Sequence, residues 1–380
     1  MASSSQARLA LFYAAYFGTV GILLPFWPLW LAHRGLDASA IGSVLSAWFW
    51  VKLFGNPIAS HIADARGSRR LFMVSLAVLT VAGFALFALA ESLWHFVLLA
   101  FLTGGFFAAL APLGESLTLR RAEVEGTDYG RVRLWGSIAF ILCSIGGGRL
   151  LEHVPVPWVI YLLVATSGCL VVACMIAPEA PAASGPSTLG GVWRFASRPR
   201  FVLFLLCAAC VQVSHAVYYG FATLHWRQAG HSEWLVGLLW AEGVVAEIAL
   251  FSASRRVGAR FSPAALLVLA CLAGIVRWSV LGSTTALWAL VLVQVLHGLT
   301  FGAAHLGAMS FLQRNVPAEH SAAAQGVYSA AVMGAAFGVV MPFAGSLYEG
   351  SRGDAFFLGT ALAAVGLVLA FALRRGGDGR

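Results

Sequence analysis

Eight ionisable side chains lie inside long apolar stretches of this sequence, where charged residues are otherwise rare. They are Lys52, Glu115, Glu242, Glu247, Arg277, His215, His297 and His305. A charge that faces lipid costs roughly 2.5–3.5 kcal/mol, so such groups usually face a protein interior or a water-filled cavity. A buried carboxylate that alternates between ion pairing and protonation can carry a proton, because burial raises the pKa of an unpaired acid. These residue types therefore predict proton and ion-pair chemistry within a membrane.

Lys52 and Glu247 are central to this prediction. Lys52 is the only lysine in the chain, and a shift of 195 residues aligns it with Glu247. Two opposite charges at equal estimated depth predict either a functional pair or a static ion pair. In the functional interpretation, Lys52 binds a substrate carboxylate and Glu247 carries the proton.

Arg277 keeps its positive charge and therefore needs partners. Glu242 is the acid at the most similar estimated depth. Glu242 and Glu247 are five residues apart, about 140° around a helix, so they do not share a face. We expect one of these acids to pair with Arg277 and the other to serve the central cavity.

Histidine and tyrosine side chains form a second candidate group. His215, Tyr218 and Tyr219 have i, i+3, i+4 spacing, which places them on one helix face. This face would offer hydrogen bonds and aromatic surface to an aromatic acid or a sugar. His297 and His305 are eight residues apart, about 80° around an α-helix, and each is a candidate for proton coupling or for hydrogen-bonded packing. Neither has a carboxylate or cysteine at ligand spacing, so we expect no metal site.

The elements that must position these residues are membrane-spanning helices. The chain has 380 residues, 60% hydrophobic and 11% charged, whereas soluble domains carry about 25% charged residues. This composition excludes a soluble enzyme or a nucleic-acid-binding protein. Apolar blocks of about 20 residues match helices that cross ~30 Å of hydrocarbon. They predict an all-α protein with twelve spans, at 9–31, 39–60, 71–90, 94–118, 131–151, 157–177, 200–224, 234–252, 262–281, 286–312, 321–344 and 354–373.

The basic residues predict the orientation of these spans. Of the 24 lysine and arginine residues, eighteen lie in one set of loops, four in the opposite set and two within spans. Basic residues concentrate on the cytoplasmic side of membrane proteins. Both termini are therefore expected in the cytoplasm, and the net charge of +8 needs no nucleic acid to explain it.

A stretch rich in proline, alanine, serine and glycine divides the twelve spans into six and six. The shift of 195 residues also aligns Gly35 with Gly230 and Gly42 with Gly237, which indicates related halves. We predict an N-terminal six-helix bundle (1–177), a cytoplasmic linker (178–199) and a C-terminal six-helix bundle (200–380). Parallel repeats of this kind are related by a pseudo-two-fold axis along the membrane normal and bind solute near the middle of the membrane.

Several motifs add a family resemblance. Asp64, Gly67, Arg69 and Arg70 resemble the loop motif that follows the second helix in the major facilitator superfamily. Residues 24–27 (LPFW), 128–137 (DYGRVRLWGS), 215–221 (HAVYYGF), 245–247 (VAE) and 276–278 (VRW) together resemble the 3-phenylpropionate permease group of that superfamily. This group is related to the lactose permease and nucleoside–proton symporter groups. Glu242 does not belong to the pattern.

The resemblance implies the major facilitator fold and alternating access of a central site. It implies proton-coupled uptake of a small organic solute across the bacterial inner membrane, with an aromatic carboxylate such as 3-phenylpropionate as the first candidate. Lactose or another oligosaccharide, a nucleoside, and drug efflux are the alternatives. In the lactose permease group a glutamate, an arginine and a histidine couple the proton. Glu247, Arg277 and His297 or His305 resemble that set, although no His-x-x-Glu pair follows here.

The sequence thus assigns three groups of residues. Proton coupling is assigned to Glu247, Glu242, Arg277, His297 and His305, and substrate binding to Lys52, His215, Tyr218 and Tyr219. A cytoplasmic gate is assigned to Asp64, Arg69, Arg70, Asp128, Arg131, Arg133 and Glu115. We expect a monomer without a cofactor, whose partners are the solute, the proton and the lipid bilayer. A membrane enzyme or scaffold is the alternative class, but no G-x-S-x-G or H-E-x-x-H motif supports it.

Overall fold

The computed structural model describes residues 4–65, 69–125, 128–179, 197–317 and 320–375, and the side chains of 4, 54–65, 124 and 322 fall outside this description. Within these ranges the chain forms helices joined by turns, without a strand. Ten helical runs are long and apolar enough to cross a membrane. The last run, of 53 residues, contains two long helices, and a shorter apolar helix covers Ala38–Leu53. The helices therefore account for the twelve predicted spans, and the all-α prediction is confirmed.

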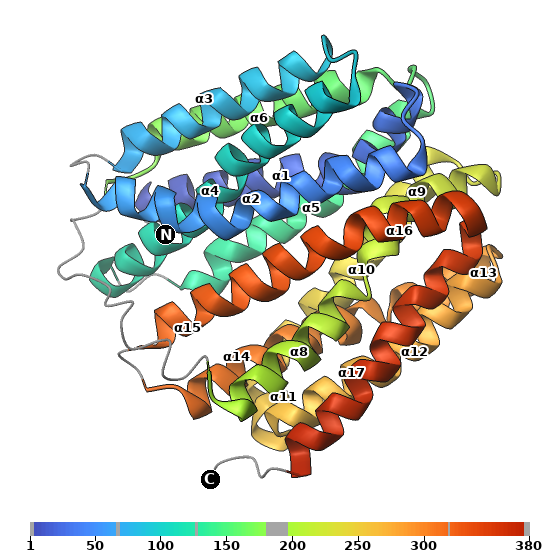
Figure 1. Ribbon diagram of the computed structural model, residues 1–380. Helices are drawn as coiled ribbons and strands as arrows, with labels where there is room; N and C mark the ends of the chain where they lie inside the picture. Colours follow the sequence, from blue (N-terminus) through green and yellow to red (C-terminus); the bar gives the residue numbers. More distant parts are fainter. Residues whose placement is uncertain (1–3, 66–68, 126–127, 180–196, 318–319, 376–380) are drawn as a thin grey trace. The chain divides into compact units, whose positions relative to one another are not determined.

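The helices group into two compact units. The first unit holds the described residues among 1–184 and 226–241, and the second holds those among 185–225 and 242–380. Most of the predicted linker, 178–199, lies outside the described residues. The first unit is built on six helices, coloured from blue to green in Figure 1. They are α1 (Ser4–His33), α2 (Ala38–Ala65), α3 (Arg69–Phe87), α4 (Leu93–Glu125), α5 (Tyr129–Leu151) and α6 (Trp158–Ile176).

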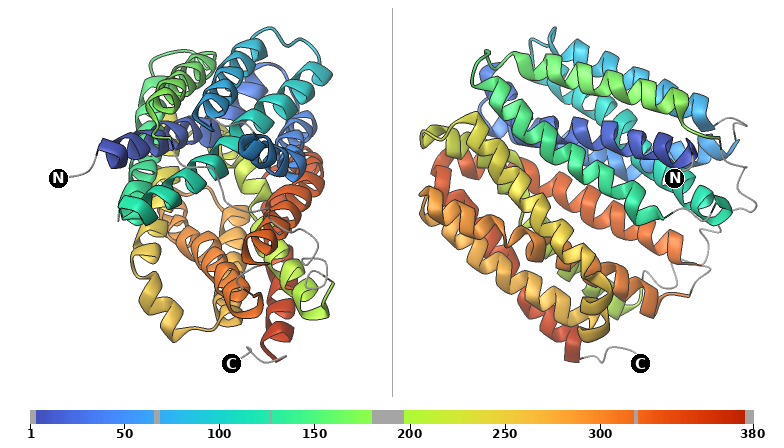
Figure 2. Two further views of the ribbon diagram at one scale, coloured as in Figure 1. Left: turned by 90° about the vertical axis from the view of Figure 1, so that its left-hand side faces the viewer. Right: turned by 180° about the vertical axis from the view of Figure 1, so that it is seen from behind.

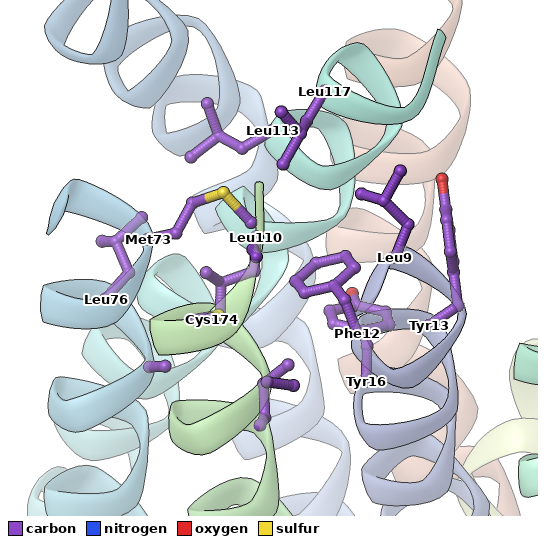
Figure 3. Packing of buried hydrophobic residues seen from close by; sticks show 14 of the residues in the cluster. Leu9, Phe12, Tyr13, Tyr16, Met73, Leu76, Leu110, Leu113, Leu117 and Cys174 are labelled. Atoms are coloured by element: carbon purple, nitrogen blue, oxygen red, sulfur yellow. The ribbon is translucent and has the colours of Figure 1, made fainter. Parts of the chain in front are cut away.

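The core of the first unit is aromatic and aliphatic. Figure 3 shows Phe12 and Tyr16 of α1 packed in one cluster with Met73 of α3 and Leu110 of α4. The Tyr16 ring stacks on Phe107, with ring centroids 4.5 Å apart. In a bilayer, helices associate through close packing because lipid tails are as apolar as leucine. The interlocking side chains therefore hold the first unit together.

The first half of α10 (Glu233–Ser252) belongs to the first unit and packs directly on α5. The Ser144 hydroxyl donates a hydrogen bond to the carbonyl oxygen of Gly237 at 3.0 Å. A Cβ atom on Gly237 would lie 2.3 Å from the carbonyl oxygen of Ser144. A Cβ atom on Gly148 would lie 2.3 Å from the carbonyl oxygen of Glu233. Both positions thus require glycine, which allows two helix backbones to approach closely.

An acidic residue marks the end of α5. Glu152 follows the last helical residue and lies 2.6 Å from Arg149, measured from Oε2 to Nη1. A hydrogen bond from Ser232, together with Arg149, holds the pKa of the Glu152 carboxyl below its usual value of 4.5. The carboxylate therefore helps to join the end of α5 to the loop that precedes α10.

The second unit is coloured from yellow-green to red (Figures 1 and 2). Its core includes the stacked rings of Phe204 and Phe311, whose centroids are 4.1 Å apart. Beyond the shared α10, its elements are α8 (Pro199–Val213), α9 (Ala216–Gln228), α11 (Ser254–Arg260), α12 (Pro263–Ser283), α13 (Leu287–Gln294), η2 (Gly298–Ala303), α14 (Ala304–Asn315), α15 (Ser321–Tyr328), η4 (Ser329–Ala336), α16 (Phe337–Ser351), η5 (Arg352–Phe356) and α17 (Phe357–Arg375). The last residues of α9 group with the first unit.

Two of these elements, η2 and η4, are π-helices. Such turns are rare and often occur at functional sites. η2 lies against the second half of α10, where a Cβ atom on Gly298 would be 2.7 Å from the carbonyl oxygen of Ala246. A Cβ atom on Gly302 would be 2.8 Å from the Leu250 side chain. The absence of side chains at these two glycines lets the π-helix and α10 lie in close contact.

Candidate functional site

Arg277 lies at the centre of a polar network inside the second unit. It is on α12, and its side chain is fully buried. Nη1 donates hydrogen bonds to His297 Nδ1 at 2.7 Å and to Thr300 Oγ1 at 3.0 Å. Nη2 donates to Gln294 Oε1 at 2.8 Å. Because these three acceptors come from the α13–η2 segment, they hold the guanidinium group in one orientation.

Aromatic rings cover the guanidinium group. The Arg277 Cζ atom lies 4.5 Å from the centroid of the Tyr218 ring and 4.7 Å from that of Trp278. The Tyr218 hydroxyl accepts a hydrogen bond from Gln294 Nε2 at 2.8 Å. Cation–π contacts of this kind stabilise a desolvated cation. The rings and the amide thus shield a permanent charge that would otherwise be costly to bury.

His297 connects Arg277 to Glu247. His297 Nε2 lies 2.8 Å from Glu247 Oε1. An arginine N–H can only donate, so His297 Nδ1 must accept the bond from Arg277 and carry no proton. We therefore assign the neutral tautomer with its proton on Nε2, from where it donates to the Glu247 carboxylate. A cation, a neutral imidazole and an anion form one hydrogen-bonded chain.

Glu247 is the accessible end of this chain. Its side chain is 18% exposed, whereas that of His297 is 9% exposed. Glu247 lies on the second half of α10, next to the close contact between Ala246 and Gly298. That contact fixes the distance between Glu247 and His297.

The predicted group of His215, Tyr218 and Tyr219 joins the same network. The His215 and Tyr219 rings stack with centroids 5.4 Å apart, and His215 lies 5.6 Å from the His297 ring. His215 and Tyr218 are both buried, with exposures of 0% and 1%. Six of the predicted functional residues therefore meet in one unit: Glu247, Arg277, His297, His215, Tyr218 and Tyr219.

Thr300 and Gln294 were missed at the sequence level. Both are buried polar residues on the tenth span, and both bind Arg277. They stand three residues after and three residues before His297. Polar residues at this spacing in an apolar helix share a face, and that feature would have identified them.

Glu242 and His305 occupy other positions. Glu242 is half-buried and is not among the hydrogen-bond partners of Arg277 in the described part of the chain. His305 stacks on Phe301 with centroids 6.3 Å apart, and Phe301 stacks on His297 at 5.6 Å. The role of both residues in proton coupling stays a prediction.

The predicted substrate cation, Lys52, lies in the first unit. It is half-buried on α2, with its ammonium nitrogen 4.7 Å from the centroid of the Phe49 ring. Trp48 precedes it by one helical turn on the same face and packs against Phe107 of α4, with centroids 6.2 Å apart. Lys52 and Glu247 belong to different units, so their encounter stays a prediction.

Two residues assigned to the cytoplasmic gate are held separately. Arg133 of α5 lies over Phe17, with Cζ 3.8 Å from the ring centroid, and 5.6 Å from the centroid of Tyr13. Glu115 of α4 is exposed and accepts a hydrogen bond from the Tyr129 hydroxyl at 2.8 Å. Aromatic rings therefore position Arg133, and the Tyr129 hydroxyl positions Glu115.

Two further gate residues, Arg69 and Arg70, tie helix ends together within the first unit. Arg69 Nη1 donates to Ser116 Oγ at 3.0 Å, which joins α3 to α4. Arg70 lies 3.5 Å from Glu179, just beyond α6. The side chain of Asp64 and all of Gly67 lie outside the described residues. Whether these groups form a gate stays a prediction.

Asp128 and Arg131 interact locally. Asp128 is the N-cap of α5, where its Oδ1 accepts a hydrogen bond from the Arg131 backbone N–H at 3.2 Å. Asp128 Oδ2 also lies 3.5 Å from Arg131 Nε. Aspartate is a favoured N-cap because it satisfies a free backbone donor of the first turn. Part of the 128–137 motif therefore starts a helix.

The described residues thus place a buried charge chain in one helical unit and a cation beside aromatic rings in the other. A family model described as MFS_1 like family matches residues 6–358 of the chain. The chain belongs to this family. It is consequently a secondary transporter of the major facilitator type and not an enzyme, as the resemblance in its motifs predicted.

Individual relatives agree with this assignment. The chain is 35% identical over 356 residues to the "Probable 3-phenylpropionic acid transporter" of Escherichia coli (strain K12), covering 92% of this chain and 93% of that protein. It is 29% identical over 340 residues to the maltose permease of Geobacillus stearothermophilus, covering 87% and 84% of the two chains.

A solved structure shows the same fold. The crystal structure of the nucleoside transporter NupG matches with a TM-score of 0.84 at 17% identity, covering 98% of this chain and 99% of that chain. The prediction of a major facilitator fold is confirmed by this similarity.

Proposed function

We propose that this protein is a proton-coupled symporter that takes up a small aromatic carboxylate across the bacterial inner membrane by alternating access. The observation that carries the proposal is the chain from Glu247 through His297 to Arg277. The similarity to a relative named as a 3-phenylpropionic acid transporter supports the substrate class.

Glu247 is the proton carrier in this proposal. A proton cannot be added at His297 Nδ1, because that nitrogen already accepts a hydrogen bond from Arg277. A protonated His297 ring would also place a second positive charge against the guanidinium group. The Glu247 carboxylate is more exposed than the His297 ring and is therefore the more accessible site for a proton.

Charge balance links the proton to the solute. Glu115 is exposed near the end of α4 and accepts a hydrogen bond from Tyr129, so it is left out of this balance. The other charged groups first named contribute two positive charges, Lys52 and Arg277, and two negative charges, Glu242 and Glu247. Protonation of Glu247 leaves one buried positive charge uncompensated, which is costly in a medium of low dielectric constant. A monoanionic carboxylate restores the balance. Proton binding and carboxylate binding therefore favour each other, as linkage requires.

The first unit provides groups that suit an aromatic acid. Lys52 offers an ammonium group to the carboxylate, and Trp48 on the same face of α2 offers an aromatic surface. Tyr219 of the second unit, which is half-buried, is proposed to line the substrate path. The predicted cytoplasmic gate, the cytoplasmic termini and the monomeric state complete the proposal.

Uptake into proteoliposomes tests the proposal. Labelled 3-phenylpropionate, maltose and uridine are supplied with and without an inward proton gradient, and protein-free liposomes measure passive entry of the protonated acid. We expect gradient-driven accumulation of 3-phenylpropionate above the protein-free control. Failure of all three probes to accumulate would overturn the proposed symport.

A second arm separates an anionic solute from a neutral one. One proton with one carboxylate moves no net charge, so a potassium diffusion potential should leave the uptake rate unchanged. One proton with a neutral sugar or nucleoside moves one positive charge, and its uptake should rise with an inside-negative potential. Potential-dependent uptake of maltose or uridine would therefore contradict a carboxylate substrate.

A further inference from the structure

The turn between α8 and α9 carries a histidine whose ring nitrogens both have partners. α8 ends at Val213 and α9 begins at Ala216, and His215 lies in the turn between them. Its ring is fully buried. His215 Nδ1 lies 3.0 Å from the carbonyl oxygen of Gln212 and 3.3 Å from that of Val211. His215 Nε2 lies 3.1 Å from Thr300 Oγ1.

The chemistry of these partners assigns the protons. A carbonyl oxygen can only accept, so His215 Nδ1 carries a proton and the neutral ring accepts at Nε2. The Thr300 hydroxyl has one proton, and its oxygen already accepts from Arg277 Nη1 at 3.0 Å. It can donate to His215 Nε2 at 3.1 Å or, over a longer distance of 3.4 Å, to the carbonyl oxygen of His297. We assign the shorter bond.

These assignments give one continuous direction of donation. Arg277 donates to Thr300, Thr300 donates to His215, and His215 donates to the carbonyl groups at the end of α8. The Thr300 proton is thereby directed away from Arg277, which leaves its lone pairs facing the guanidinium group. The same Arg277 Nη1 atom also donates to His297 Nδ1.

We propose that His215 is a positioning residue of the proton chain, which acts through Thr300 to hold Arg277 against His297 Nδ1 and so keeps the His297 proton on Nε2, facing Glu247. This inference rests on the proposed proton coupling. Because its ring is buried and both of its nitrogens are engaged, His215 is better suited to this task than to direct contact with a solute, the role expected from its spacing with Tyr218 and Tyr219.

Besides Thr300, Arg277 has two other neutral acceptors, Gln294 and His297. Thr300 therefore does not act by neutralising the charge of Arg277. Gln294 holds the Nη2 edge at 2.8 Å, independently of Thr300. Loss of the Thr300 hydroxyl therefore leaves the guanidinium group bound by Gln294 at Nη2 and by His297 alone at Nη1, so that it can turn more freely at Nη1. We expect such turning to release His297 Nδ1, after which the imidazole proton can move between its two nitrogens.

The test is ¹⁵N NMR of histidine-labelled protein in liposomes, which distinguishes the two neutral tautomers and the cation. The chain has ten histidines, and the two signals are identified by their loss in His215→Phe and His297→Asn. We expect protonated Nδ1 in His215 and protonated Nε2 in His297. Thr300→Val should divide the His297 signal between both tautomers, and Thr300→Ser, which keeps the hydroxyl group, should restore the single tautomer.

Transport separates this inference from the proposed function. Thr300→Val should lower proton-driven accumulation of 3-phenylpropionate about ten- to a hundredfold, the effect of one lost hydrogen bond to a charged group. His215→Phe removes a hydrogen bond between neutral groups and should lower it by up to about tenfold. Counterflow exchange should persist, because it needs no net proton movement, and its persistence shows that the variants fold. Proton-driven uptake with an unchanged His297 tautomer in Thr300→Val would overturn the positioning role alone. Absence of proton-driven uptake in the unsubstituted protein would overturn the proposed function, and the positioning role with it.

Discussion

Gly298→Ala tests how closely α10 and η2 must approach. An alanine Cβ atom would lie 2.7 Å from the carbonyl oxygen of Ala246, and ordinary contacts begin at 3.4 Å. The two elements must therefore separate by about 0.7 Å, the difference between these distances. The Glu247–His297 distance of 2.8 Å would then lengthen to about 3.5 Å, beyond the usual range for N–H···O bonds.

The energetic effect follows from that distance. A hydrogen bond to a charged group contributes about 1.5–3 kcal/mol, and each 1.4 kcal/mol corresponds to a factor of about ten in an equilibrium. We expect the substitution to reduce proton-driven accumulation by about ten- to a hundredfold. Counterflow exchange of the same solute should change little, because exchange does not require release of the proton.

The assay is uptake of labelled 3-phenylpropionate into proteoliposomes under an inward proton gradient. Gly350→Ala is the matched control, because a Cβ atom at Gly350 of α16 would meet nothing within 4 Å. We expect this control to accumulate the solute like the unsubstituted protein. Equal accumulation by Gly298→Ala and Gly350→Ala would refute the argument that the close helix contact sets the Glu247–His297 distance.

Three further predictions concern stability, measured as the midpoint of thermal unfolding in detergent. Gly237→Ala should lower the midpoint, because its Cβ atom would lie 2.3 Å from a backbone oxygen of α5. Gly146→Ala is the control and should not lower it, because a Cβ atom there would meet nothing within 4 Å. Equal midpoints for the two variants would contradict the packing of α10 on α5. Ser214→Ala removes the acceptor of the buried Trp278 Nε1, 2.9 Å away, and should cost about 1–3 kcal/mol, so an unchanged midpoint would show that this bond contributes nothing. The pKa of Glu152 is lowered from its usual value of 4.5. Its carboxylate therefore stabilises the folded protein at pH values above 4.5, and this stabilisation is lost as the pH falls through the folded-state pKa. Unfolding scans from pH 7 to pH 3.5 should therefore show a smaller acid-side decrease for Glu152→Gln, and identical decreases would refute the linkage.

The sequence predicted the helices well because the features that specify a membrane span are local. A block of about 20 apolar residues satisfies its own backbone hydrogen bonds only as a helix, so the spans could be predicted without knowledge of their neighbours. The charged residues inside those blocks were also predicted to be functional because lipid does not tolerate them. Arg277 and Glu247 were found in this way, and the structure connects them through one histidine.

The partners of these residues could not be predicted from depth and helical angle. Glu242 was the acid nearest to Arg277 in estimated depth, and either Glu242 or Glu247 was expected to pair with it. The bonds described for Arg277 go to neutral acceptors, and Glu247 is reached through His297. His297 and His305 were expected to lie about 80° apart around an α-helix. The π-helix η2 lies between them, and its wider turns place both rings in one column with Phe301. A local change in helical period cannot be inferred from an apolar pattern alone.

The central claim is that Glu247 carries the transported proton. A pH-sensitive dye trapped in proteoliposomes reports proton entry when 3-phenylpropionate is added outside, with protein-free liposomes as the control for passive entry of the acid. We predict that the unsubstituted protein acidifies the interior faster than this control, and that Glu247→Gln does not, while it retains counterflow exchange of the solute. Solute-driven acidification at the unsubstituted rate in Glu247→Gln would contradict the account.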